Sequence, residues 1–159
     1  MAEAGLAGVA RAREIVEEAM ARGPRGITLP VARVVEVLEC FGLPVVAMRA
    51  VASPRQAVMA AELLGYPVVA RVAGSPGVTL GHPDALATVC AAHPEVLVQV
   101  DIGPTRPAEL WPPAFAAGVA ALRAALPDLD DLDLVIEVDR AGRTWIVEAT
   151  AHIRRAAPH

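Results

Sequence analysis

The first quarter of the chain carries two helical patterns. In residues 10–22, apolar side chains recur every three or four positions and glutamates take the other side, which predicts an amphipathic helix. After a Gly-Pro break, Thr28 is suited to be the N-cap of a second helix that runs to about Phe41. Gly42 follows in the position where glycine commonly ends a helix. We predict that this pair forms an N-terminal helical arm, residues 1–43.

The middle of the chain alternates between strand and helix patterns. Val-rich segments predict four strands, and apolar residues at helical spacing predict two helices between them. The strands are expected at residues 44–51, 67–73, 78–80 and 95–101, and the helices at 54–64 and 83–92. In chain order this is β-α-β-β-α-β, the split βαβ arrangement, which requires a mixed or antiparallel sheet with helices on one face. We therefore expect an α+β fold.

The last third predicts a loop, a helix and a turn. Residues 102–113 are Pro-rich and predict an irregular connection. Residues 114–126 predict an Ala-rich helix, and the acidic residues 128–131 predict a solvated turn after it. A divalent-ion site in this acidic stretch is the alternative, but the carboxylates lack the regular ligand spacing of a calcium loop.

A β-hairpin is expected at the end of the chain. Strands are predicted at residues 132–138 and 143–149, joined by a turn in which Gly142 takes a positive φ. The tail, residues 150–159, is expected to fray. We expect residues 1–159 to form a single domain, because the length suits one domain.

Composition narrows the function classes. The chain is 55% hydrophobic but only 3% aromatic, which predicts an aliphatic core. The net charge of −4 argues against a nucleic-acid surface, and no apolar run approaches the roughly 20 residues of a membrane span. Glu3 stands where a signal peptide needs basic residues, so we expect a cytoplasmic protein. All basic residues except the four histidines are arginines, which excludes chemistry that needs a lysine amine.

Four short sequences together point to a known family. They are Arg-Ala-Arg-Glu-Ile-Val at residues 11–16, Gly-Tyr-Pro-Val-Val at 65–69, Gly-Val-Thr-Leu-Gly at 77–81 and Leu-Val-Gln at 97–99. In this combination the chain resembles the ATP-grasp domain of nucleoside-diphosphate-forming acyl-CoA synthetases, of the acetate–CoA ligase (ADP-forming) and succinyl-CoA synthetase β-subunit type. The resemblance covers most of the chain, although the chain is much shorter than the family's domain.

This resemblance implies a nucleotide site. In the family, ATP and Mg²⁺ are held between two α+β subdomains, and an active member would be an acid–thiol ligase. A lysine on the second strand contacts phosphate, a loop between the second and third strands covers it, and an acidic residue after the fourth strand contacts adenosine. Carried over, the cofactor-binding positions of this chain are Arg71, Gly74, Ser75, Gln99 and Asp101.

The carried-over positions depart from the family's pattern. Arg71 replaces the lysine, and an arginine presents a planar fork rather than a compact ammonium. Val100 takes the place of the acidic residue, so Asp101 is displaced by one position. Of the metal ligands, Asp133 matches the carboxylate, but Val135 stands where the family has asparagine and offers no oxygen. The family's large central subdomain is nearly absent, so binding of ATP and Mg²⁺ is expected to be weakened.

These departures favour a non-catalytic, regulatory or partner module related to acyl-CoA synthetases. A nucleotide-binding subunit of an active ligase, working with another chain, is the alternative, and a small structural oligomer is a third. We expect self-association or an acyl-CoA synthetase subunit as partner, because loss of a subdomain exposes apolar surface. Trp111 is expected either to cover the face that the lost subdomain would occupy or to anchor such a contact, and no catalytic residue is assigned.

The histidines, two late glutamates and the two cysteines are the remaining residues with possible chemistry. The four histidines are scattered, and loop or helix-start positions suit them better than metal ligation. Glu137 and Glu148 are expected to pair across the final hairpin, either as exposed charges or as an acid–base pair. Cys40 and Cys90 are expected inside helices, as core residues.

Overall fold

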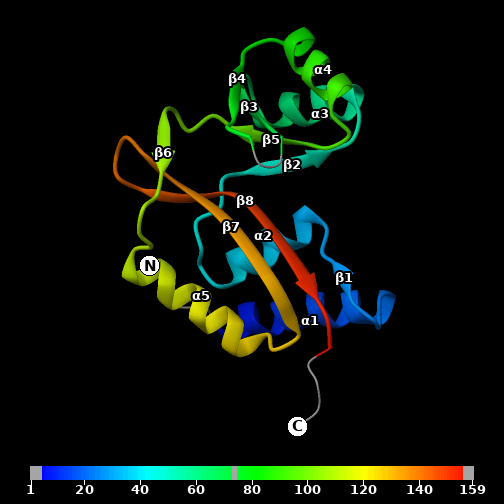
Figure 1. Cartoon of the computed structure of the whole chain (residues 1–159), viewed down its shortest axis with the longest axis vertical. Coiled ribbons are helices and arrows are strands. Elements are labelled where there is room, and N and C mark those ends of the chain that lie inside the picture. The colour runs from blue at the N-terminus through cyan, green and yellow to red at the C-terminus, as the bar shows by residue number, and fades with distance from the viewer. Residues whose placement is uncertain (1–4, 73–74, 156–159) are drawn as a thin grey trace. The chain divides into compact units, whose positions relative to one another are not determined.

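The computed structural model describes residues 5–72 and 75–155, which form two compact units (Figure 1). Unit 1 combines the two ends of the chain, Met1–Val45 and Thr105–His159, and unit 2 is the continuous segment Val46–Pro104. None of the described helices is long and apolar enough to cross a lipid bilayer. That residues 1–159 act as one domain stays a prediction of the sequence.

Unit 1 packs three helices with a four-stranded antiparallel sheet. The helices are α1 (Leu6–Arg22), α2 (Val31–Cys40) and α5 (Pro113–Ala125). The sheet has the order β1-β8-β7-β6, with β1 (Ile27–Thr28), β6 (Thr105–Pro107), β7 (Leu129–Asp139) and β8 (Thr144–Ile153). The long β7–β8 hairpin is its centre, and its turn contains Gly142 at φ 82°. The expected helical pair and closing hairpin are therefore confirmed.

The core of unit 1 is aliphatic, as the composition predicts. Residues from both ends of the chain meet in it: Ile15 of α1, Leu38 of α2, Leu122 of α5 and Ile146 of β8 are at most 2% exposed. Burial of such side chains is the main stabilising term of folding. The N-terminal helices thus belong to the same core as the C-terminal hairpin.

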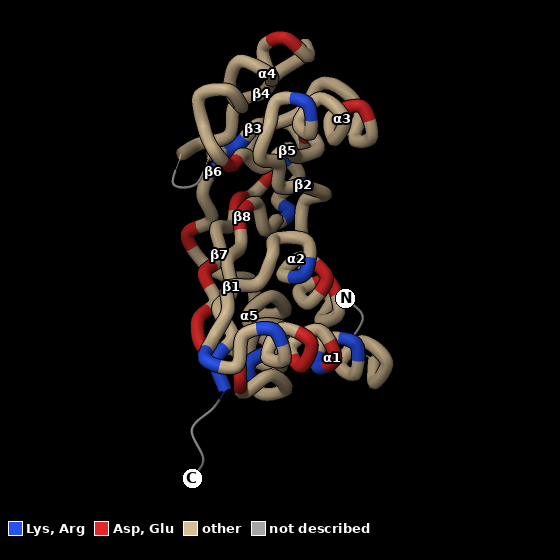
Figure 2. The backbone as a smooth tube through the Cα atoms, turned by 90° about the vertical axis from the view of Figure 1, so that its right-hand side faces the viewer, with Lys and Arg blue, Asp and Glu red and all other residues tan. Residues whose placement is uncertain are grey.

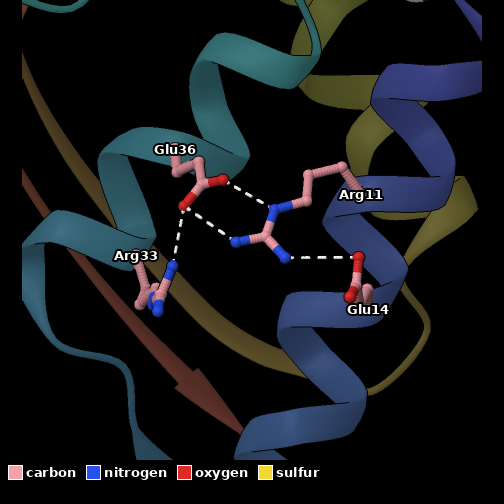
Figure 3. Close-up of polar contacts among 4 residues, drawn as sticks. All are labelled: Arg11, Glu14, Arg33 and Glu36. Atoms are coloured by element: carbon pink, nitrogen blue, oxygen red, sulfur yellow. Dashed lines mark hydrogen bonds and ion pairs between the residues drawn. The ribbon is translucent and has the colours of Figure 1, made fainter.

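An ion-pair network joins α1 to α2 at the surface of unit 1 (Figure 3). Arg11 donates from Nε to Glu36 Oε2 at 2.7 Å, and Arg33 donates from Nη1 to Glu36 Oε1 at 2.9 Å. Arg11 also forms an ion pair with Glu14 at 3.2 Å. The hydrogen bond from Arg11 holds the pKa of Glu36 below its usual value. Because these side chains are about a third or more exposed, solvent screens the network and it contributes little to stability.

Unit 2 is the predicted β-α-β-β-α-β fold. Its elements are β2 (Met48–Val51), α3 (Pro54–Leu64), β3 (Val68–Arg71), β4 (Val78–Leu80), α4 (Pro83–Ala92) and β5 (Val96–Val100). The sheet order is β2-β5-β3-β4, and all neighbours are antiparallel. Each pair of strands joined by a helix is therefore parallel with one antiparallel strand between them, which defines a split βαβ.

Both helices of unit 2 lie on one face of its sheet (Figure 1). Ser53 caps α3, since its Oγ accepts a hydrogen bond from the amide of Gln56 at 3.2 Å. His82 caps α4, since its Nδ1 accepts one from the amide of Asp84 at 3.2 Å. Each helix then opens with proline, which suits the first turn. The sequence predicted both starts, and His82 has the expected helix-start position.

Three local expectations are corrected by the structure. Thr28 does not cap α2; it lies in β1, and its Oγ1 is 3.3 Å from His152 Nδ1, while Pro30 holds the N-cap position. The strand expected at 44–51 is shorter, because only Met48–Val51 pairs along β5. The connection 102–113 contains the strand β6. This strand lies at the edge of the sheet, where a proline such as Pro107 is tolerated.

The predicted acidic turn and the first part of the predicted frayed tail are also corrected, while residues 156–159 of that tail lie outside the described residues. Leu129 already begins β7, so Asp130 and Asp131 belong to a strand whose apolar residues alternate into the core. At the other end, β8 continues to Ile153 and buries Ala151 and Ile153, because β1 pairs with this segment. Neither extension has a local signal, since both depend on a partner strand distant in sequence.

Candidate functional site

The cation predicted to meet phosphate lies on the helix-free face of the sheet in unit 2. Along β3, Val68 and Ala70 face the helices and are buried in the core of unit 2. Side chains of a strand alternate, so Arg71 belongs to the opposite face. Gln99 of β5 lies on that face too, because it pairs in register with Val69. Two of the expected site residues therefore come from adjacent strands.

Arg71 and Gln99 are held by the protein itself. Arg71 is 5% exposed and Gln99 is 2% exposed, and Arg71 Nε donates to Gln99 Oε1 at 3.4 Å. The amide nitrogen of Gln99 lies 3.9 Å from Met48 Sδ. Both Arg71 and Gln99 have further interactions within the protein. The guanidinium of Arg71 is thus buried and has partners within the protein, and its contact with phosphate stays a prediction of the resemblance.

Two of the other predicted nucleotide contacts, Ser75 and Asp101, form hydrogen bonds within turns. Gly74 lies outside the described residues. Ser75 is exposed, and its amide donates to the carbonyl of Val72 at 3.0 Å, so this amide closes a turn. Asp101 Oδ1 accepts from the amide of Gly103 at 2.9 Å, which likewise fixes a turn.

The predicted metal position lies in unit 1, on the exposed face of the β7–β8 hairpin. Asp133 and Val135 are exposed, whereas Leu132 and Ile136 point into the core. Figure 2 marks the acidic positions along β7 in red. Asp133 pairs in register with Thr150, and Val135 pairs with Glu148. The register then shifts by one residue of β8, so that Ile136 pairs with Ile146.

This arrangement does not fit Mg²⁺. The ion requires several oxygen ligands in octahedral geometry, and Val135, beside Asp133 and opposite Glu148, offers none. Within residues 5–72 and 75–155, no group of three or more His, Cys, Asp or Glu side chains could hold a metal ion. Sequence reasoning named Asp133 but missed Glu148 as its neighbour, because the bulge that sets the register has no signal in the apolar pattern.

The expected pair Glu137–Glu148 is wrong in register. Glu137 pairs with Trp145, and its Oε1 accepts a hydrogen bond from Thr105 Oγ1 at 2.6 Å. Glu148 instead pairs with Val135. Because of the shift between them, the two carboxylates do not oppose each other across the hairpin.

Both cysteines lie in helices, as the sequence predicts, and both tryptophans belong to unit 1. Cys40 ends α2 and Cys90 is buried in α4; both are free thiols, and burial raises the pKa of each. Trp145 is half-buried on the sheet of unit 1. Trp111 is 44% exposed and packs edge-on against Phe115, with 5.1 Å between ring centroids.

Comparisons with known proteins agree with this fold. Residues 19–80 match the sequence model of the ATP-grasp domain family, a segment that contains Arg71. A search of curated proteins gives no significant match. Among solved structures, an ADP complex of N5-carboxyaminoimidazole ribonucleotide synthetase is similar with a TM-score of 0.53 and 18% identity. The alignment covers 83% of this chain but 45% of that one, so this chain spans less than half of it.

A second solved structure is similar over its full length. It is acetyl-coenzyme A synthetase 1 of Ca. Korarchaeum cryptofilum, in complex with coenzyme A, acetyl-coenzyme A and a phosphorylated phosphohistidine segment. The TM-score is 0.55 at 17% identity, and the alignment covers 90% of this chain and 100% of that one. At these identities the structures establish the fold, and the matched segment adds the sequence relation. Residues 19–80 are thus similar in sequence to the ATP-grasp domain family, and the split βαβ unit and the closing hairpin are similar in fold to these solved structures.

Proposed function

We propose that the chain is a non-catalytic ATP-grasp-like module related to acyl-CoA synthetases, which acts by binding as a regulatory or partner subunit. ATP-grasp domains generally bind ATP with Mg²⁺. Phosphoryl transfer in such a site needs positive charge and metal placed at the transferred phosphate. The observation that carries the proposal is the state of the β3 cation: Arg71 is buried and bonded to Gln99.

The predicted metal position at Asp133 supports the same proposal. Val135 stands beside Asp133 and opposite Glu148, where an oxygen ligand would be needed. Without a bound metal, the charge that develops on the phosphate oxygens lacks the ion that neutralises it in phosphoryl transfer. Arg71 alone does not replace it, because its guanidinium already has partners in the protein.

Calorimetry with ATP tests the proposal. Titrations of the full chain are run with Mg²⁺ and with EDTA, and ADP release is assayed in the same samples. We expect no Mg²⁺-dependent binding in the micromolar range and no ADP formation. The variant Arg71→Ala should give the same trace as the wild type. Micromolar, Mg²⁺-dependent binding of ATP by the wild type would refute the proposal.

The alternative is a nucleotide-binding subunit of an active acyl-CoA ligase that is complete only with another chain. The likeness to a full chain of acetyl-coenzyme A synthetase 1 favours it over the purely structural oligomer. If this alternative holds, addition of the partner should bring ATP binding, and Arg71→Ala should abolish it. An unchanged ATP affinity of Arg71→Ala in the complex would remove Arg71 from the site.

A partner is part of the proposal. Met59 and Leu63 are 58% and 73% exposed and stand four residues apart on α3, so they share one helix face. Each 100 Å² of such apolar surface removed from water is worth about 2.5 kcal/mol. We expect self-association or a complex with an acyl-CoA synthetase subunit, in the cytoplasm. Sedimentation that shows a monomer over a wide concentration range, with no co-purifying subunit, would count against it.

A further inference from the structure

Gly77 lies across from Arg71 at the end of the β3–β4 ladder. The register pairs Val68 with Leu80, Val69 with Thr79 and Ala70 with Val78. One further step in an antiparallel pair places Gly77 opposite Arg71. Directly opposite residues on one sheet face have their Cβ atoms about 5 Å apart, so whatever stands at position 77 decides the space available to Arg71.

That space is filled by two side chains from β3. A Cβ on Gly77 would stand 2.6 Å from Val69 Cγ1, 3.0 Å from Arg71 Nη2 and 3.4 Å from Arg71 Cζ. The guanidinium therefore rests against the backbone of residue 77. Its other side meets β5, where Nε donates to Gln99 Oε1 at 3.4 Å. The planar group is held between Gly77 and Gln99 within unit 2.

Backbone conformation does not require glycine at this position. Among the described residues, the glycines with positive φ are Gly26, Gly42, Gly65, Gly103 and Gly142. Gly77 is not one of them, so its φ is open to any residue. The requirement is for space alone, and that space is taken by Val69 and Arg71.

We propose that Gly77 is the positioning residue for Arg71: the missing side chain at position 77 lets the guanidinium lie inward between β4 and β5, and a larger residue there would expel it. A lysine on β3 would carry a compact ammonium instead of a planar group that lies against residue 77. The absence of a side chain at position 77 therefore matters because position 71 is an arginine, so the effects of substitutions at the two positions should depend on each other. The inference goes beyond the proposed function and does not depend on it, because it concerns the state of Arg71 whether or not ATP binds.

The reactivity of Arg71 toward phenylglyoxal tests the pair. This reagent modifies accessible guanidinium groups, and peptide mass spectrometry gives a rate for each arginine. The rate at Arg71 is divided by that at Arg55, which is exposed on α3 of the same unit. All variants carry Val69→Ala, so that the contact at 2.6 Å is removed and only the contacts with Arg71 remain.

The size of residue 77 should set the rate. Gly77→Ala requires the guanidinium to move by only a few tenths of an ångström, so the modification rate of Arg71 relative to Arg55 should change little. Gly77→Val should raise it by about tenfold or more, because Arg71 loses its protected position. Gly81→Val is the matched control: Gly81 is also outside the positive-φ set, and a Cβ there meets nothing within 4 Å.

Two outcomes would overturn the inference. One is a relative Arg71 rate in Gly77→Val no higher than in Gly81→Val. The other concerns stability: in urea, Gly77→Val should lower the unfolding midpoint less when Arg71 is replaced by alanine, since the space is then vacant. An equal loss of midpoint with Arg71 and with Ala at position 71 would show that the two positions are not coupled.

Discussion

The hydroxyl of Tyr66 is buried without a hydrogen-bond partner, and it is the one such side-chain oxygen or nitrogen among the described residues. Burial accordingly raises the pKa of Tyr66. A buried polar group that makes no hydrogen bond costs about 1–3 kcal/mol of desolvation. Tyr66→Phe keeps the ring and removes the hydroxyl, so we expect the free energy of unfolding to stay equal or to rise by up to about 1 kcal/mol.

Urea unfolding followed by circular dichroism measures this change. Trp145→Phe serves as the comparison, because Trp145 Nε1 donates to Asp139 Oδ2 at 2.9 Å and that bond would be lost. We expect Trp145→Phe to lower the free energy of unfolding. If Tyr66→Phe were the more destabilising of the two, the hydroxyl would have a partner in solution and the interpretation of Tyr66 would be wrong.

Asp139 gives unit 1 a pH dependence. Its carboxylate accepts hydrogen bonds from Trp145 Nε1 and from the amides of Arg143 and Ala141, which hold its pKa below the usual value of an aspartate. A lowered folded-state pKa stabilises the fold above the unfolded value of about 3.9 and is lost as pH falls through the lowered value. The free energies of unfolding of the wild type and of Asp139→Asn should differ at pH 7, and the difference should shrink as the pH falls below about 3.9. A difference that persists unchanged at pH 3 would assign the effect to shape rather than to charge.

At the scale of single residues, the resemblance named candidate positions but not the contacts that these residues make. Arg71 and Gln99 both lie in strands that the sequence predicts. That Arg71 bonds to Gln99, and that Gly77 gives it room, depends on distances between three strands. No spacing along one strand carries that information. The turn roles of Ser75 and Asp101 were likewise hidden, because local hydrogen bonds compete with ligand contacts for the same polar groups.

Two helical glycines allow a comparison at the scale of elements. A Cβ on Gly8 of α1 would stand 2.8 Å from the carbonyl oxygen of Cys40, at the end of α2. A Cβ on Gly118 of α5 would stand 2.9 Å from Leu43 Cδ2, the tip of a flexible side chain. Alanine favours a helix over glycine by up to about 1 kcal/mol, so propensity alone predicts that both substitutions stabilise.

The contact at Gly8 should reverse that gain. A carbonyl oxygen of α2 cannot rotate away, so Gly8→Ala must shift or fray α1, and we expect a loss of about 1–3 kcal/mol, as for other overpacked sites. Leu43 can adopt another rotamer, so Gly118→Ala should cost less than Gly8→Ala. Thermal unfolding of both variants checks this order. The opposite order would mean that α1 and α2 are not closely packed in solution.

Helices and strand-forming segments were predictable because their signals are local. Ser53 and His82 precede prolines in positions that start helices, and α3 and α4 begin at those prolines. β1 and β6 had no such signal: each is two or three residues long and exists only because β8 or β7 supplies the ladder. The end of β8 was missed for the same reason. Short strands depend on partners far away in the chain, which a window of sequence does not contain.

At the scale of the whole molecule, chain order does not follow structural units. Residues 46–104 form unit 2, inserted between two segments that share the core of unit 1. The N-terminal helices, expected as an arm, therefore pack with the C-terminal hairpin. Apolar periodicity gives the buried face of each helix, but it does not say which distant element covers that face.

The two cores differ in a way that predicts unequal local stability. The buried core of unit 2 is the smaller one, and it includes four alanines: Ala57, Ala60, Ala61 and Ala70. The core of unit 1 is built mainly from leucine, isoleucine and valine. Alanine buries little apolar area, so the packing of unit 2 contributes less free energy per residue. Regions with few large buried contacts open at lower free energy.

Hydrogen exchange followed by mass spectrometry should separate the two units. We expect amides of β3 and β5 to exchange faster than those of β7 and β8 under native conditions, because sub-global opening of unit 2 needs less free energy. Leu86→Ala removes one of the largest fully buried side chains of unit 2 and should accelerate exchange in β3 and β5 while β7 and β8 keep their rates. Leu122→Ala in α5 is the matched change in unit 1. If either variant accelerated all four strands equally, the chain would open as one cooperative unit, and the small core of residues 46–104 would have no stability of its own.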